Sequence, residues 1–308
     1  MLLLCWAKPS LANSVGISYG QQDYQVSLPT NSNVSLKPVG SAVSLTLDLG
    51  TDWLVDFDYQ QWADEQSVNN QFDLTLDIKT FGSGLTYFLN DWSFSTSYSR
   101  SEIDTDYSGK RRVANSLTEN ITASSIGGSV AYGQAIDNWF YSALFSGLYS
   151  SWDFDKLEVI NNLSGSGSNS DSGSGSDNVS ILIREEKSAG NSTSLSASIS
   201  LAHFWPITAH RGILLGGLFS WHYLLAGDAV LISRNGRNFS SVSRNIYDQR
   251  AQSNAALNTI SGDDSYGQVS FYVSYDLTSS LSIEFDSSVN VASDYNVRTW
   301  SIGLGYLF

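Results

Sequence analysis

Six carboxylic acids have a spacing that could serve chemistry in this 308-residue chain. They alternate with large apolar side chains, as where Asp56 and Asp58 flank Phe57. Successive side chains of an extended chain point to opposite faces, so acids at every second position share one face. Solvated acids, or acids paired with arginines, are one interpretation of this face, and a lining that favours cations is the other. The acids that we assign to it are Asp48, Asp56, Asp58, Asp276, Glu284 and Asp286.

The three histidines, His203, His210 and His222, do not form a catalytic arrangement in the sequence. His222 shares its face with Ser220 and precedes Asp228, but a catalytic relationship requires these side chains to lie within hydrogen-bond reach in space. We therefore expect His222 to be a structural residue of a strand. Neither a clustered set of metal ligands nor a Ca²⁺-loop motif occurs, so we expect no metal and no cofactor.

The elements that carry these residues are predicted from alternation with period two. In the stretch 296–308, the large apolar residues Trp300, Ile302, Leu304, Tyr306 and Phe308 alternate mostly with Ser and Gly. We count twelve such segments along the chain, joined alternately by short turns and longer polar loops. The first segment, 15–28, changes phase near Gln21 and Gln22, which we interpret as a bulge. The predicted loops include 104–122, a flexible Gly/Ser-rich loop at 153–191, and a second long loop at 226–265.

Composition restricts the class of protein. Hydrophobic residues make up 42% of the chain and charged residues only 15%, yet no apolar run is long enough for a membrane helix. A net charge of −14 argues against a nucleic-acid partner, and the single cysteine, Cys5, cannot form an internal disulfide. Because an open sheet in lipid would leave edge groups unsatisfied, we predict an all-β, closed antiparallel transmembrane β-barrel of about 12 strands. Its turns would be short on the periplasmic side and its loops long on the extracellular side.

The two ends of the chain agree with export. Residues 1–12 have an apolar stretch followed by the small-x-small pattern Ser10-Leu11-Ala12, which is typical of a remnant of a secretory signal peptide. The barrel would then span 13–308. The chain ends on Leu304, Tyr306 and Phe308, which resemble the C-terminal signal that bacterial outer-membrane barrels present to their assembly machinery.

Together with hairpins such as 85–98, this final strand resembles the β-domains of autotransporters and related uncharacterised outer-membrane barrels. The resemblance implies an integral protein of the bacterial outer membrane. Its expected partners are outer-membrane lipid, lipopolysaccharide and the barrel assembly machinery. We predict a passive channel or structural surface protein with an acidic, small-residue lumen. The alternative is an autotransporter-type translocator barrel that lacks its passenger.

A surface hydrolase is the third possibility. Omptin-type proteases pair an Asp-x-Asp with an Asp-x-His, and only Asp56-Phe57-Asp58 matches in type. Leu201, Thr208 and Ser220 occupy the position two residues before each histidine, so the second motif is absent. Outer-membrane phospholipases use a lipid-facing Ser and His, whereas alternation places His222 on the polar face. The prediction is therefore that the protein is not an enzyme.

Overall fold

Each described secondary-structure element of the chain is a β-strand. The computed structural model describes residues 13–27, 33–50, 52–68, 72–109, 116–163, 179–208, 211–227, 265–278, 280–291 and 297–308. Among the described residues, no helix is long and apolar enough to cross a membrane. The strands in chain order are β1 (Ser14–Ser27), β2 (Asn33–Leu36), β3 (Val39–Asp48), β4 (Trp53–Val68), β5 (Phe72–Leu89), β6 (Trp92–Gly109), β7 (Ser116–Ile136), β8 (Trp139–Leu163), β9 (Val179–Thr208), β10 (Arg211–Gly227), β11 (Ser265–Asp276), β12 (Leu281–Val291) and β13 (Val297–Leu307).

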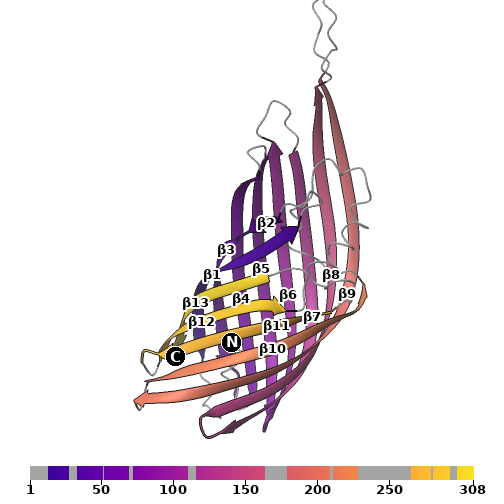
Figure 1. The fold of residues 1–308 in the computed structure, drawn as a ribbon. Helices are drawn as coiled ribbons and strands as arrows, with labels where there is room; N and C mark the ends of the chain where they lie inside the picture. Colours follow the sequence, from indigo (N-terminus) through magenta and orange to yellow (C-terminus); the bar gives the residue numbers. More distant parts are fainter. Residues whose placement is uncertain are drawn as a thin grey trace, which may run out of the picture.

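The strands form one closed antiparallel barrel (Figure 1). Each strand from β3 to β13 pairs with its neighbour in the chain, and β1 pairs with β3 on one side and with β13 on the other. The short strand β2 continues β3 along β1, in the same register, beyond the break at Lys37 and Pro38. The wall therefore has twelve strand positions, which confirms the predicted twelve-stranded barrel.

Pairing also sets the tilt of the strands. A path of directly paired residues that starts at Ala135 on β7 and runs once around the barrel returns to β7 at Ile121, 14 residues away. With ordinary strand spacings, this displacement over twelve strands gives a tilt of roughly 40° and a backbone radius of about 12 Å. Small inward side chains would leave free space in a barrel of this radius.

Tight turns join the strands at one end of the barrel, which we call the turn end. The first and the last described residues also lie at this end. Asn90 and Asp137 begin two of these turns with a left-handed φ of 54°, which Asn and Asp tolerate. Gly50 occupies a third turn at φ 126°, a conformation that favours glycine. The Phe308 N–H donates to the Asn13 carbonyl at 2.9 Å, so the last and first described residues are joined at this end.

A belt of large apolar side chains covers the outside of the barrel. Tyrosines and tryptophans form a row at each edge of this belt, for example Trp92 and Tyr98 on β6, or Tyr306 and Trp300 on β13, all of which are exposed. Neighbouring rings touch within a row, as in Trp53–Tyr87 at 4.8 Å and Trp92–Tyr132 at 5.1 Å. The two rows are six residues apart along a strand, about 20 Å, which suits the apolar band of a membrane barrel.

The wall is much taller on one side than on the other, as Figure 1 shows. We call the end of the barrel opposite the turns the loop end. Strands β4–β9 continue well past the aromatic row toward the loop end, and we call them the tall wall. β13, in contrast, begins at Val297, close to Trp300. The predicted loops at 104–122 and 153–191 are corrected accordingly, since β6, β7, β8 and β9 occupy 104–109, 116–122, 153–163 and 179–191.

One further sequence prediction is wrong, and others concern residues that the structure does not describe. Strand β1 keeps one register along β13 from Ser14 to Tyr24, so the predicted bulge at Gln21 and Gln22 is wrong. The Gly/Ser-rich tract 164–177, most of the second long loop, and residues 1–12 with Cys5 lie outside the described residues. The predicted signal remnant therefore stays a prediction.

Candidate functional site

The interior of the barrel is the candidate site, because strand register gathers the six acids there. Asp56 and Asp58 on β4 face inward with their partners Thr46 and Ser44 on β3. Asp286 lies opposite Tyr272 and Ser301, and Glu284 opposite Ser274 and Gly303. Asp276 pairs with Ser282, and Asp48 lies beside the turn, where its Oδ1 accepts the Gly50 N–H at 2.7 Å.

The acids occupy one side of the lumen. Their strands, β3, β4, β11 and β12, flank β13 and β1, which close the barrel. The inward positions of these two closing strands at the belt level are Gly and Ser, for example Gly303 opposite Ser18 and Ser301 opposite Gly20. No bulky side chain therefore separates the two groups of carboxylates across the closure.

Hydroxyl groups line the other side of the lumen at the belt level. Cross-strand oxygen pairs join neighbouring strands: Ser146 and Ser196 at 2.6 Å, Ser125 and Ser150 at 2.8 Å, and Thr86 and Ser95 at 2.9 Å. Ser198 donates to Ser220 at 2.9 Å. Paired hydroxyls satisfy one another and supply neutral polar groups opposite the acids, beside inward leucines such as Leu148 on β8.

Basic side chains of the described residues lie elsewhere. Lys79, Arg100 and Lys187 point outward above the belt, where each pairs with a carboxylate; the Lys79–Asp77 distance is 3.0 Å. The hydrogen bond and the charge of Asp77 raise the pKa of the Lys79 ammonium. Lys156, an inward lysine with an exposed fraction of 6%, lies on β8 beyond the belt. Inward positions of the described strands within the belt thus carry acids and no Lys or Arg.

The histidines have different surroundings. His222 faces inward and stacks on Tyr266 with ring centroids 4.5 Å apart, and its Nε2 has no hydrogen-bond partner among the described residues. His203 faces outward between Trp139 and Trp205, with ring centroids at 4.5 and 4.2 Å. Both rings are packed into the wall by aromatic neighbours. His210 lies outside the described residues.

The surroundings of the serine, histidine and aspartate side chains can be compared with those that a surface hydrolase would need. Ser220, two residues from His222, accepts its hydrogen bond from Ser198. Asp56 and Asp58 lie on the inward face only a few residues from Trp53, at the start of β4, and therefore near the turn end. Within the described ranges, no group of three or more His, Cys, Asp or Glu side chains is placed to hold a metal ion.

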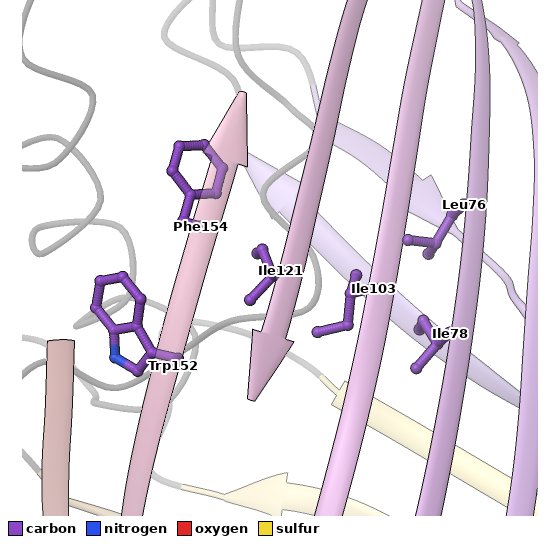
Figure 2. Packing of buried hydrophobic residues seen from close by; sticks show 6 residues of the cluster. All are labelled: Leu76, Ile78, Ile103, Ile121, Trp152 and Phe154. Carbon is purple, nitrogen blue, oxygen red and sulfur yellow. The ribbon is translucent and has the colours of Figure 1, made fainter. Parts of the chain in front are cut away.

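A buried apolar cluster lies on the inner face of the tall wall beyond the belt, and sequence analysis missed it. A row of directly paired residues crosses five strands there: Trp62, Ile78, Ile103, Ile121 and Phe154. Leu76 and Trp152 join them in one buried cluster, and Figure 2 shows its six most buried members on β5–β8. The exposed fraction is 0% for Leu76 and 1% for Phe154. The alternation of residues 116–123 and 152–156 could have revealed this cluster.

Comparison with known proteins supports the fold. No family model matches the chain. No curated protein matches its sequence. Among solved structures, it is similar to the translocator domain of the autotransporter NalP from Neisseria meningitidis, with a TM-score of 0.60 and 10% identity over 97% of this chain and 90% of that one. The β domain of the Bordetella autotransporter BrkA gives a TM-score of 0.57 and 10% identity, over 96% of this chain and all of that one.

The fold is thus that of the β-barrels of the bacterial outer membrane. With its belt of exposed aromatic and aliphatic residues, the chain is a transmembrane barrel of this class. The turn end then corresponds to the periplasmic side and the loop end to the extracellular side.

Proposed function

We propose that the barrel is a passive outer-membrane channel that prefers cations. The observation that carries this proposal is the charge of the lumen: described inward positions within the belt hold carboxylates and no Lys or Arg. Charges on a narrow, low-dielectric wall are screened less than charges on an open surface. A few carboxylates therefore raise the local concentration of cations and lower that of anions.

The test is the reversal potential of the refolded protein in a planar bilayer under a salt gradient. The wild type is expected to be cation-selective, and Asp56→Asn with Asp58→Asn should move the reversal potential toward zero. Raising the salt should weaken the preference, because the Debye length falls from roughly 10 Å at 0.1 M to about 3 Å at 1 M. An anion-selective wild type, or a double variant with unchanged selectivity, would overturn the proposal, and absence of conductance would favour a structural surface protein.

A second candidate function is suggested by the likeness to autotransporter domains. The similar structure from Neisseria meningitidis is the translocator domain of the autotransporter NalP. The present barrel, fused behind a reporter domain with an export signal, would expose the reporter on the cell surface if it acts as a translocator. A reporter that stays protease-protected in a strain where the barrel is correctly assembled would exclude this role.

The proposed partners follow from the outer surface. Leu304 and Tyr306 lie on the outward face of β13, and Phe308 follows its last residue; all three are exposed, with the rings of Tyr306 and Phe308 stacked at 6.4 Å. We propose that these three residues are recognised by the barrel assembly machinery, and that the belt contacts lipid and lipopolysaccharide. Deletion of Phe308 should then lower the amount of folded barrel in the membrane, as judged by heat-modifiable mobility on gels.

A further inference from the structure

Two luminal carboxylates rest directly on glycines of the next strand. Asp56 pairs with Gly84 and Asp58 with Gly82, on β4 and β5. A Cβ atom added to Gly84 would lie 2.6 Å from Oδ1 and 2.7 Å from Oδ2 of Asp56. A Cβ on Gly82 would likewise overlap the carboxylate of Asp58. Each carboxylate therefore fills the space that a side chain on the neighbouring strand would occupy.

A looser contact of this kind occurs on the other acidic strand pair. A Cβ added to Gly305 of β13 would lie 2.9 Å from Ser282 Oγ and 3.3 Å from Oε1 of Glu284, whose own partner on β13 is Gly303. The missing side chains let these acids lie along the wall, and both Asp56 and Asp58 are half-buried as a result. Charge is thus kept at the wall and does not project toward the axis of the barrel.

An alanine at Gly82 or Gly84 would displace a carboxylate without breaking the wall. For both glycines, the three atoms nearest to an added Cβ all belong to the end of the aspartate side chain, and none belongs to the backbone. A flexible side-chain end can rotate away at little cost in free energy. The available direction is into the lumen, because the wall occupies the other side.

We propose that Gly82 and Gly84 are positioning residues that set the selectivity of the channel by holding Asp58 and Asp56 against the wall. The expected effect on selectivity rests on the proposed channel function, but the position of the two carboxylates can be tested separately. Moving a carboxylate toward the path of the ions strengthens its interaction with them, because Coulomb energy varies inversely with distance. Gly84→Ala should therefore increase the preference for cations.

The experiment compares Gly84→Ala with the wild type in planar bilayers. We expect the cation-to-anion permeability ratio to rise by roughly 1.5- to 3-fold. The same substitution in an Asp56→Asn background should have no effect, because no charge remains to be moved. Gly128→Ala is the matched control: this strand glycine faces lipid, and its added Cβ would have only the Ser95 carbonyl oxygen within 4 Å, at 3.8 Å.

A second readout does not depend on conduction. Coupling of a small amine to Asp56 by a water-soluble carbodiimide, followed by site-resolved mass spectrometry, should be faster in Gly84→Ala than in the wild type. An unchanged coupling rate, or an altered permeability ratio that persists with Asp56→Asn, would overturn the positioning role. Failure of the proposed channel function would be observed separately. The barrel would then not conduct, or its selectivity would be the same in the wild type and in the double variant Asp56→Asn, Asp58→Asn.

Discussion

The belt-level half and the loop-end half of the tall wall have opposite polarity on the same strands. On β5, Phe81 and Tyr87 point outward at the belt level, opposite the small inward residues Gly82 and Gly84. Nearer the loop end of this strand, Leu76 is buried on the inner face while Asp77 lies on the outer face. The strand itself continues without a change of register along β4 and β6.

The inversion follows from what each face contacts. Lipid surrounds the belt, so apolar residues face outward there and the lumen is polar. Beyond the belt the outer face meets water, and the wall follows the pattern of a soluble sheet with a buried inner face. Asp104 and Asp155 on the outer surface and Ile103 and Phe154 inside illustrate this on β6 and β8. Period two identifies the two faces, and the surrounding medium decides which of them is apolar.

The largest expected effect contrasts packing in the two halves. Phe154→Ala should destabilise the barrel by about 3–5 kcal/mol, because it leaves a cavity in the buried cluster. Leu148→Ala, on the inward face of the same strand at the belt level, should cost about 1 kcal/mol, since this leucine is 40% exposed. Urea-induced unfolding in lipid vesicles measures both. Equal costs would contradict the assignment of a packed interior to the loop-end half alone.

Sequence reasoning found the belt because its signal is uniform. Outward residues such as Tyr59 and Trp300 are large and apolar, while most inward residues are small or polar, so the twelve strands and most of their turns are predictable. The same reasoning predicts loops at 104–122 and 153–191 within the loop-end half, since acids such as Asp104 and Asp106 appear where a lipid-facing strand would have apolar residues. The phase change in β1 was misinterpreted as a bulge for this reason, although the register shows none.

The candidate site was predictable only in part. Alternation assigned Asp56 and Asp58 to one face, but no sequence pattern indicates that they lie on Gly84 and Gly82, because that pairing depends on the register between β4 and β5. The outward position of His203 between two tryptophans was equally out of reach. Trp139 is 64 residues before it in the chain, and only strand pairing brings them together.

The inversion predicts where a charge is tolerated on the outer surface. Phe271→Arg should destabilise by roughly 2–4 kcal/mol, because this exposed residue belongs to the lipid-facing belt. Thr75→Arg, also on the outer face but beyond the belt, should be nearly neutral, since the guanidinium stays in water near Asp106 and Glu65, the strand neighbours of Thr75. Refolding yields and unfolding midpoints in vesicles compare the two. A severe loss of stability in Thr75→Arg would mean that the lipid-facing belt reaches Thr75, and it would contradict the proposed boundary between the two halves.

The smallest effect concerns the hydroxyl wall of the belt-level lumen. Ser146 and Ser196 lie 2.6 Å apart between β8 and β9, and both are half-buried. Replacing either by alanine should cost about 0.5–1.5 kcal/mol, the net contribution of one hydrogen bond, and the double variant should cost less than the sum because the second change removes no further bond. We therefore expect a double-mutant cycle, measured by unfolding in vesicles, to give a coupling free energy within that range. Strictly additive costs would mean that water replaces the lost hydroxyl without penalty, so that hydration rather than the pairing of hydroxyls stabilises this half of the wall.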